Sequence, residues 1–284
     1  MPSPNDPLSS LLKSFKHYHA DLKGKRIWLA LSGGRDSLGL AHACLILYQS
    51  GDLPFLPQLL HVNHRLHSAS DDWARQVLDW ANCHAMPCTV LNIHPNGQDE
   101  GSLRVARYSA LCEPMNTDDV LLLAHHQDDQ VETVLMRLFN GTGVIGLGGM
   151  RDWSTRQRPI AIGGDTVTLW RPWLTVSREH ITAYAIAHRL PYIDDPTNVY
   201  PLTENTPFEA NARAWMRSEL LPLIQTRYPQ ARIAIARTAG VMQGANAVNS
   251  ETVQADLAKV QVMPPTFATL STWHCEIDIS SLFT

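Results

Sequence analysis

The chain has 284 residues, 44% of them hydrophobic and 18% charged, which is ordinary for a globular protein of one large or two modest domains. Five cysteines without a Cys-x-x-Cys pair argue against a disulfide framework or a zinc ribbon and predict a reducing, cytoplasmic setting. No apolar run approaches the length of a membrane span, and no signal peptide is expected. The formal net charge of -4 does not favour nucleic-acid binding by the whole surface, but it allows a local basic face.

The first strong signal is the segment Ser32-Gly-Gly-Arg-Asp-Ser37, which lies between an apolar strand at 26–31 and an apolar helix that runs to about residue 50. Two glycines let the backbone approach a ligand closely, and the N–H groups of the first helical turn point into the turn. This arrangement predicts a phosphate site. The Gly-Lys-Ser/Thr of a Walker A loop is missing, so the turn is a phosphate loop of another kind.

Strands and helices alternate around this turn. An amphipathic helix is predicted within 1–23, further strands at 58–63, 88–93 and 120–124, and helices at 71–85 and 102–111, the first of these capped by Ser70. Continuous apolar strands alternating with helices predict an α/β fold with a parallel, Rossmann-like sheet. Ligands bind beyond the carboxyl ends of such strands, so the Ser32 turn, residues 61–64 and the His125 region should face one crevice.

The second strong signal follows the strand at 120–124 and contains two histidines and three carboxylates. His125 and His126 precede a helix whose first turns carry Asp128, Asp129 and Glu132. Carboxylates at a helix N-terminus can simply stabilise the helix dipole, but the adjacent histidines favour a polar site. A zinc site is the alternative, with His61 and His64 as further ligands, although the helical phase points Asp128 and Asp129 in different directions.

The remaining chain predicts a smaller, mostly helical region. Residues 141–149 hold five glycines and form either a tight path beside a ligand or a mobile element. A hairpin is predicted at 159–171 with its turn at 163–165, a helix capped by Ser177 to about 189, and loops at 194–198 and 200–207. A helix is predicted at 209–221, before Pro222. The alanine-rich sequence at 230–260 predicts one long or two broken helices, and its small residues suggest close helix packing. We expect a catalytic domain at 1–206 and a helical region at 207–284.

The chain resembles the tRNA(Ile)-lysidine synthetase family of PP-loop ATP pyrophosphatases over about 26–222. The resemblance depends on a succession of motifs in the family's order. They are Ser-Gly-Gly-Arg-Asp-Ser37, Val62-Asn-His-Arg-Leu66, Leu103-Arg-Val-Ala-Arg-Tyr108, Ala124-His-His-Gln-Asp-Asp-Gln-Val-Glu-Thr133, Arg137-Leu-Phe-Asn-Gly141, Gly146-Leu-Gly-Gly-Met150, Arg171-Pro-Trp-Leu174 and Asp195-Pro-Thr-Asn198. The His-His-x-Asp-Asp-Gln helix followed by Gly-Leu-x-Gly-Met is the most specific of them.

The resemblance implies an enzyme that adenylates the C2 oxygen of the wobble cytidine in an isoleucine tRNA with a CAU anticodon. The ε-amine of free L-lysine then displaces AMP. The cofactors implied are ATP and Mg²⁺, with the metal near Asp36. By the family pattern, ATP is held by the phosphate turn and the end of the second strand, that is by Ser32, Gly33, Gly34, Arg35, Asp36, Ser37 and Asn63.

By the same resemblance, Asp129 and Glu132 recognise lysine, and His125 or His126 orients the nucleotide or accepts a proton from the attacking amine. Arginines are expected to contact phosphates of ATP or tRNA, namely Arg104, Arg107, Arg171, Arg213 and Arg217. Whether the two arginine clusters of the sequence, near 151–178 and 213–237, are a basic face or scattered surface charge stays open. The oligomeric state also stays open, a homodimer included.

Some features depart from the family pattern. Thr197 replaces a serine, the insert 200–207 is longer, His67 stands where arginine is common, and Arg213-Ala-Trp-Met-Arg217 keeps both arginines but loses an asparagine. Many members continue into C-terminal domains that grip the tRNA, so a truncated form and a naturally short form both remain open. The alternatives are a thiolating PP-loop tRNA enzyme, a non-catalytic nucleotide-binding module and a metal-dependent phosphohydrolase.

Overall fold

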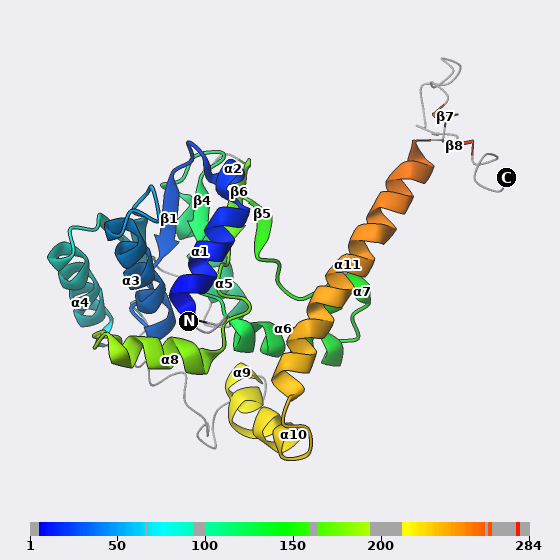
Figure 1. Cartoon of the computed structure of the whole chain (residues 1–284). Coiled ribbons are helices and arrows are strands. Elements are labelled where there is room, and N and C mark those ends of the chain that lie inside the picture. Colours follow the sequence, from blue (N-terminus) through cyan, green and yellow to red (C-terminus); the bar gives the residue numbers. More distant parts are fainter. Residues whose placement is uncertain are drawn as a thin grey trace.

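The computed structural model describes residues 6–65, 68–93, 100–159, 164–193, 212–258, 261–262 and 277–278. In these ranges a six-stranded sheet lies between helices, and a long helix extends away from it (Figure 1). The strands are β1 Ile27–Ala30, β2 Gln58–Asn63, β3 Cys88–Asn92, β4 Val120–Leu122, β5 Trp153–Gln157 and β6 Thr166–Trp170. The helices among them are α1 Pro7–His17, α2 His19–Leu22, α3 Arg35–Gln49, α4 Ser70–Cys83, α5 Glu100–Cys112, α6 Gln127–Phe139, α7 Val144–Leu147 and α8 Arg178–Ala187.

The strand order is β3-β2-β1-β4-β6-β5, and every pair is parallel except β5 with β6. Leu29 of β1 pairs with Leu59 of β2 on one side and with Leu122 of β4 on the other, so β1 runs through the middle of the sheet. This confirms the predicted parallel, Rossmann-like α/β class. From β1 the chain adds β2 and β3 on one side and then returns to add β4 on the other side. The strand order therefore switches between β1 and β4, and the expected crevice lies at the carboxyl ends of these two strands.

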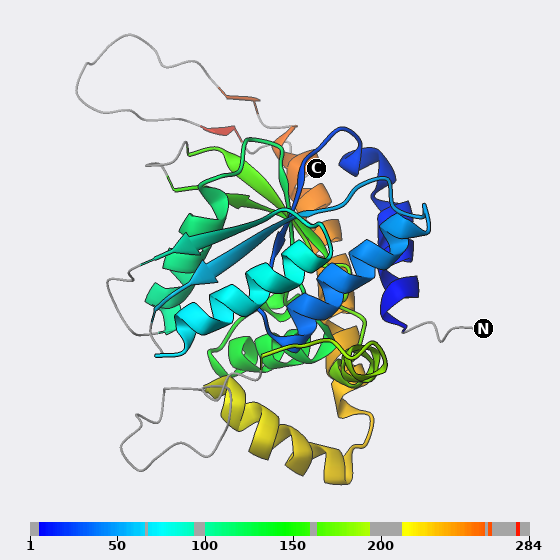
Figure 2. The same ribbon diagram turned by 90° about the vertical axis from the view of Figure 1, so that its left-hand side faces the viewer.

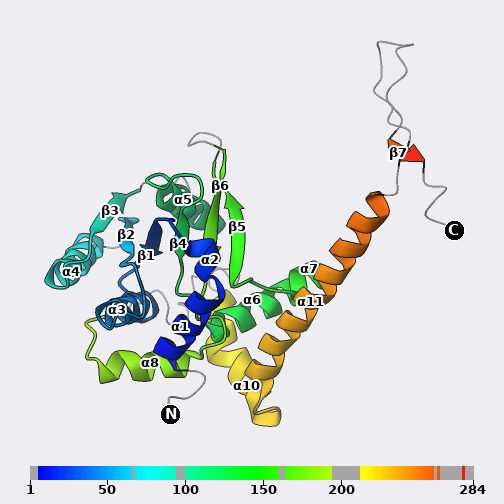
Figure 3. The ribbon, with the colours of Figure 1, turned by 45° about the horizontal axis from the view of Figure 1, so that its top comes forward.

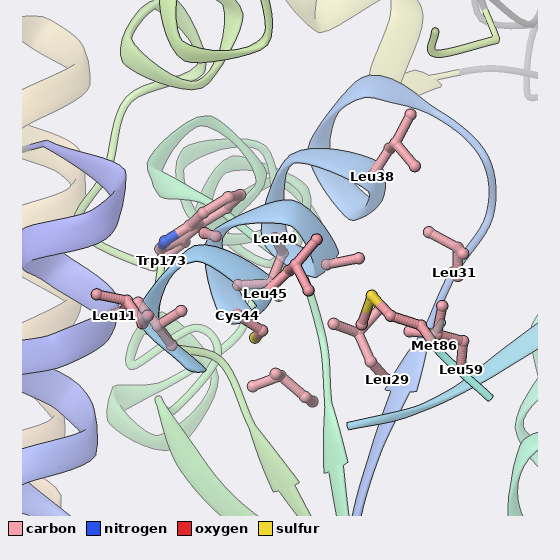
Figure 4. Packing of buried hydrophobic residues seen from close by; sticks show 14 of the residues in the cluster. Leu11, Leu29, Leu31, Leu38, Leu40, Cys44, Leu45, Leu59, Met86 and Trp173 are labelled. Atoms are coloured by element: carbon pink, nitrogen blue, oxygen red, sulfur yellow. The ribbon is translucent and has the colours of Figure 1, made fainter. Parts of the chain in front are cut away.

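Apolar side chains cover both faces of the sheet, which explains the uninterrupted apolar strands. On one face, Leu29 and Leu59 pack with Leu40 of α3 and with Trp173 (Figure 4). Helices α3 (blue) and α4 (cyan) lie in front of this face in Figure 2. On the other face, Trp28 packs with residues of α5. Successive residues of β1 therefore point into two different cores, as the pleat of a strand requires.

Two local predictions were wrong. Ser70 does not cap α4, because it is the first helical residue, and Ala69 in the N-cap position makes no side-chain cap bond. The predicted hairpin exists, but its first strand is β5 Trp153–Gln157, ahead of the predicted start at Pro159. Arg158 still donates its N–H to the carbonyl of Asp165, whereas Pro159 has no N–H to continue the ladder.

The C-terminal helices are α9 Ala212–Trp215, the π-helical segment η3 Met216–Leu220, α10 Leu221–Arg227 and α11 Ala231–Leu257. Pro222 lies in the first turn of α10 and does not end the helical run, which begins before it with α9 and the π-helical segment η3. Residues 230–260 hold one long helix, which packs against α6 and α7. The predicted close helix packing is confirmed where α11 contacts these two helices, and Ala231 and Ala239 are buried there.

Short strands β7 Gln261–Val262 and β8 Ile277–Asp278 pair beyond α11. The domain boundary expected at 206/207 and the loops at 194–198 and 200–207 lie outside the described residues, as does His67. Within the described ranges, no helix combines the length and the apolar character that crossing a membrane requires.

Candidate functional site

The predicted phosphate turn joins β1 to α3 and is closed by its two serines. Ser32 Oγ and Ser37 Oγ lie 2.9 Å apart, and Ser37 Oγ also donates to the carbonyl of Gly34 at 3.1 Å. Gly33 has a φ of 86°, and a Cβ there would lie 2.8 Å from Ile193 Cδ1 and 2.9 Å from Val77 Cγ2. Gly34 is the N-cap of α3 with an ordinary φ of -70°. The unpaired N–H groups at the start of α3 thus face the turn, as an anion site requires.

Asp36 and Asp129 meet at a single histidine. His126 Nε2 lies 3.6 Å from Asp36 Oδ2 and 3.6 Å from Asp129 Oδ2. Asp129 also accepts the backbone N–H of His126 at 3.0 Å, which completes a capping box at the start of α6. The structure therefore brings the phosphate turn and the His-Asp segment into one site, although they are about ninety residues apart in the chain.

The charge of Asp36 is stabilised by its neighbours. Burial by itself would raise the pKa of the Asp36 carboxyl, but the hydrogen bond and charge of His126 lower it well below its usual range. The charges of Arg35 and Arg178 act in the same direction. Arg35 Nε donates to Asp36 Oδ1 at 3.2 Å. Asp36 is therefore a carboxylate at any working pH, which is the form that a metal ion or a cation needs.

His125 points into a different environment from His126. Burial lowers the pKa of His125 to about 3; Asp129 opposes this shift, whereas Arg171, Arg104 and Arg213 add to it. Its Nδ1 is buried without a hydrogen-bond partner among the described residues. His125 is therefore a neutral imidazole beside several arginines, and its free nitrogen is available to a ligand.

The three carboxylates of α6 have separate surroundings. Asp128 is buried and ties α6 to two other helices, since it accepts the N–H of Arg178 at 2.8 Å and pairs with the Arg232 guanidinium of α11. Glu132 is 0% exposed and accepts two bonds from Arg217, Nε to Oε1 at 2.9 Å and Nη2 to Oε2 at 3.1 Å. Arg213 Nη1 lies 3.8 Å from the same carboxylate. Asp128 and Asp129 thus diverge as predicted, and Glu132 faces the arginines of 212–220.

Asn63 and Arg107 lie at the other side of the crevice, at the end of β2. Asn63 is buried and its Nδ2 donates to Asp71 Oδ1 at 2.7 Å, while its side-chain Oδ1 accepts the N–H of Arg65. Arg107 Nε donates to His64 Nε2 at 3.2 Å. Burial, Arg107 and His61 together lower the pKa of His64 to about 4. These contacts hold the end of β2 against α4 and α5.

The glycine-rich segment at 141–149 is held in place by side chains from α6 and α11. Gln130 Nε2 donates to the carbonyl of Met150 at 2.8 Å, and Gln130 Oε1 accepts its N–H at 2.7 Å. Arg137 donates to the carbonyls of Gly146 and Gly149, and Gln243 to that of Gly148. Of the two interpretations left open by the sequence, the structure favours the tight backbone path.

A cavity of about 370 Å³ lies between this glycine-rich segment, α5 and α11. Four arginines line it and no acidic residue does, and the lining residues are Arg104, Arg137, Ile145, Gly148, Gly149, Met150, Arg151, Ser154, Arg171, Met242, Gln243 and Asn246. The buried Arg171 is fixed by two bonds from Nη1, to the carbonyl of Arg151 and to Ser154 Oγ. This basic cavity is suited to phosphate groups.

The sequence alone did not single out Gln130, Arg137, Arg151 or Arg178 as site residues. Arg137 and Gln130 stood inside the quoted motifs, so their place in those motifs was an available signal. Arg151 and Arg178 belonged to an arginine cluster that had been left open. A dedicated zinc site gains no support, because no three His, Cys, Asp or Glu side chains in the described ranges are grouped to hold a metal ion. His61 instead contacts the carbonyl of Leu31 at 2.8 Å.

Comparison with known proteins identifies the domain that carries this site. A model of the PP-loop domain matches residues 7–224, which is most of the chain. Among solved structures, the U34-tRNA thiolase NcsA of Methanococcus maripaludis, which carries a [4Fe-4S] cluster, is similar with a TM-score of 0.56. It is 16% identical and the match covers 84% of this chain and 80% of that one, so the likeness shows the fold alone.

Curated relatives are much closer in sequence. The tRNA(Ile)-lysidine synthase of Psychrobacter sp. (strain PRwf-1) is 52% identical over 88% of this chain and 49% of its own length. That of Acinetobacter baylyi is 36% identical over 81% and 46%. The chain thus spans about half the length of these relatives. For the Bordetella pertussis tRNA(Ile)-lysidine synthase, 36% identical, the match covers 83% of this chain and 71% of the relative. The chain therefore belongs to the PP-loop proteins and, among them, to the tRNA(Ile)-lysidine synthase family.

Proposed function

We propose that the protein ligates free lysine to C2 of the wobble cytidine of tRNA(Ile) with a CAU anticodon, using ATP. The observation that carries the proposal is the meeting of the phosphate turn and the carboxylates of α6 at His126, 3.6 Å from both Asp36 and Asp129. In the first step the cytidine O2 attacks the α-phosphorus of ATP and pyrophosphate leaves. In the second step the lysine ε-amine attacks C2, loses a proton, and AMP leaves with the former O2.

The phosphate turn supports the first step. N–H groups at the start of α3 and the hydroxyls of Ser32 and Ser37 surround the space where pyrophosphate charge would develop. Asp36 projects from the same turn as a stable carboxylate. Arg35 lies beside it and Asn63 stands at the end of the neighbouring strand β2, within reach of the rest of a nucleotide.

Asp36 at the phosphate turn fits Mg²⁺. This ion is usually held by one or two carboxylates together with substrate phosphates, and Asp36 is such a carboxylate beside a phosphate turn. Bound there, Mg²⁺ would neutralise charge on the leaving pyrophosphate. The chain's own contribution is geometric, because the capping box of His126 and Asp129 fixes both side chains at the start of α6.

Asp129 and Glu132 are the proposed lysine site, and a neighbouring arginine already bonds one of these carboxylates. A carboxylate can hold a substrate ammonium, but both oxygens of Glu132 are bonded to Arg217. For an ammonium to reach Glu132, Arg217 must give up at least one of these bonds, which would free it to bind a carboxylate or phosphate. Asp129 is 20% exposed and needs no such exchange.

The basic cavity supports tRNA binding despite the net charge of -4. Arg104 and Arg171 line it and also surround His125, so it adjoins the proposed catalytic site. We assign Arg107 and Arg213 to the same role. His125, held neutral, is suited to a hydrogen bond with the base or nucleotide. His126 contacts the two carboxylates, so we assign it to their positioning.

Incorporation of labelled lysine tests the proposal. The purified 284-residue chain, with ATP, Mg²⁺ and a CAU-anticodon tRNA(Ile) transcript, should release pyrophosphate and attach lysine to the tRNA. A transcript with a guanosine in place of the wobble cytidine is the control and should accept none. Since relatives are about twice as long, a full-length relative run beside it shows that the tRNA and assay are competent. Pyrophosphate release without lysine attachment, or neither with a competent tRNA, would contradict the proposal.

The proposed lysine site is tested by Asp129→Asn combined with Glu132→Gln. The double variant should raise the KM for lysine by about tenfold or more while the KM for ATP changes little, because the carboxylates proposed for the ammonium are lost while the phosphate turn is unchanged. Asp128→Asn is the matched control, since Asp128 is a buried carboxylate of the same helix bonded to Arg178 and Arg232. Equal losses for lysine and ATP would remove the assignment.

A further inference from the structure

Arg178 is fixed by its backbone at the junction of α8 and α6. It is the first residue of α8, directly after the N-cap Ser177. Its N–H donates to Asp128 Oδ2 at 2.8 Å, and the N–H of Gln127 donates to the carbonyl of Val176 at 2.9 Å. Figures 1 and 3 show α8 with one end beside α6. The start of α8 is therefore held against the start of α6, where the phosphate turn also arrives.

The guanidinium of Arg178 is half-buried and unpaired within the described part of the chain. In these ranges its hydrogen bonds come from the backbone, to Asp128 Oδ2 and from Thr182 Oγ1. Three neighbouring arginines, by contrast, each bond a carboxylate, and these pairs are Arg35 with Asp36, Arg217 with Glu132 and Arg232 with Asp128. The donors of the Arg178 guanidinium are therefore available to a ligand.

A purely structural role does not account for this side chain. A cation in the first turn of a helix is unfavourable, because the helix dipole is positive at that end. Burial lowers the pKa of the Arg178 guanidinium, so removing this charge from water costs free energy. No ion pair of Arg178 within the described ranges offsets these two costs. Unfavourable charged groups of this kind are typical of functional sites.

The charges around Arg178 place its guanidinium between two parts of the candidate site. Asp36, at the phosphate turn, and Glu132, at the proposed lysine site, both act on it favourably. Arg217 and Arg35, from the same two parts of the site, act on it unfavourably. The interaction with Asp36 is mutual, since Arg178 helps to keep that carboxyl ionised. The guanidinium thus stands where the phosphate turn and the start of α6 meet.

One substrate group has to occupy this region in the proposed reaction. The α-phosphate of ATP is bonded to the pyrophosphate, which the phosphate turn would hold. It then becomes bonded to O2 of the cytidine, whose C2 the lysine attacks. The α-phosphate must therefore lie between the phosphate turn and the lysine site. A guanidinium suits it, because the planar fork of donors matches two phosphoryl oxygens.

We propose that Arg178 is a catalytic residue that binds the α-phosphate of ATP and stabilises it during adenylation of the tRNA. This inference rests on the proposed function. Cytidine O2 forms the new bond to phosphorus, and pyrophosphate leaves with the electron pair of the broken P–O bond. Arg178 donates hydrogen bonds to the non-bridging oxygens throughout and transfers no proton. A preorganised cation at this point stabilises the charge that the transition state places on these oxygens.

The rate of adenylation is the first test. Pyrophosphate release is measured with ATP, Mg²⁺ and the CAU-anticodon transcript, without lysine. Arg178→Met should slow it by about a hundredfold, because one charged donor to the reacting phosphate is lost. Arg178→Lys should keep part of the rate, since it keeps the charge but not the fork. Arg189→Met is the matched control: it is the same change just beyond the other end of α8, at an exposed residue, and should leave the rate unchanged.

Ligand binding without tRNA is the second test, and it needs no turnover. Calorimetry compares α,β-methylene ATP, which carries the α-phosphate, with inorganic pyrophosphate, which does not. Arg178→Met should weaken binding of the analogue by about tenfold and leave pyrophosphate binding unchanged. A chain that binds the analogue in this Arg178-dependent way but never modifies tRNA would remove the proposed function and still support the phosphate contact.

Three results would overturn the assignment of Arg178. A raised KM for lysine with unchanged pyrophosphate release would place the guanidinium on the carboxylate of lysine. Equal weakening of the analogue and of pyrophosphate would place it on the leaving group or on the turn itself. Arg178→Met that behaves like Arg189→Met in both tests would leave it without a role in either step.

Discussion

Gly33 and Gly34 look equivalent in the sequence but do different things in the turn. Gly33 has a positive φ of 86° and touches Ile193 and Val77, whereas Gly34 has an ordinary φ of -70° and its nearest neighbour to an added Cβ is Ser32 Oγ at 3.4 Å. Only Gly33 is required by the backbone. Gly34 gives space to a ligand above the start of α3.

We therefore expect Gly33→Ala to lower the free energy of unfolding by about 1–3 kcal/mol, because alanine is strained at this φ and its Cβ meets Val77. Gly34→Ala is the control and should change stability by less than about 0.5 kcal/mol. Urea unfolding of both variants measures the difference. Equal losses for the two substitutions would show that the conformation of Gly33 is not what the turn depends on.

At the scale of elements, one ion pair joins α6 to the C-terminal helices. Glu132 is fully buried in α6, and Arg217 of the π-helical segment η3 bonds both its oxygens. Burial alone would lower the pKa of the Arg217 guanidinium, but the hydrogen bond and charge of Glu132 raise it. π-helical turns are frequent at functional sites, and this one places Arg217 over the proposed lysine site.

Arg217→Met should destabilise the protein by about 3 kcal/mol, because it leaves the buried Glu132 carboxylate without its main partner. Combining it with Glu132→Gln should recover part of the loss, since the amide carries no charge to leave unpaired. Arg75→Met breaks an exposed ion pair with Asp72 and should change stability by less than about 1 kcal/mol. Urea unfolding of the unaltered protein, Arg217→Met, Glu132→Gln and the double variant gives the coupling energy between the two residues. A double variant as unstable as the sum of the single ones would contradict the pairing.

For the whole molecule, the buried histidines predict a loss of stability in acid. Burial, with His188 and His84 nearby, lowers the pKa of His42 from 6.5 to about 4. The ring donates to or accepts from Tyr184 Oη at 2.8 Å, beside a cavity of about 720 Å³ whose acidic lining residues are Asp72 and Asp79. Between these two pKa values the unfolded chain binds the proton and the folded chain does not, so unfolding is favoured as the pH falls.

His42→Gln should therefore reduce the loss of unfolding free energy between pH 6.5 and about pH 4. Glutamine keeps a hydrogen-bonding group toward Tyr184 and has no proton to gain. His17→Gln is the control, because His17 is exposed at the end of α1. Urea midpoints across this range measure the effect. An unchanged pH dependence in His42→Gln would assign the acid lability to other groups.

The sequence by itself determined the order and class of the elements, because periodicity and apolar runs are local properties. The strand at 58–63 coincides with β2, and Ser177 caps α8 as predicted. Local signals failed where a neighbour decided the outcome. Ser70 lies inside α4, whose N-cap position is Ala69. Pro222 follows a π-helical turn within a continuous helical run. The small residues of α11 suggested packing, but Gly240 and Gly244 lie where an added Cβ would meet nothing within 4 Å.

The candidate site divides in the same way. Its residue types were evident from the sequence, because Ser-Gly-Gly-x-Asp-Ser and His-His-x-Asp-Asp-Gln each predict polar chemistry within a few residues. Only the tertiary structure shows that these two segments meet at His126 and that Arg217 bonds Glu132. So did the arginine-lined cavity beside the glycine-rich segment. Such contacts join segments up to about a hundred residues apart, and their neighbours are decided by the parallel sheet, which gathers strand ends at one edge, and by the packing of the C-terminal helices on α6.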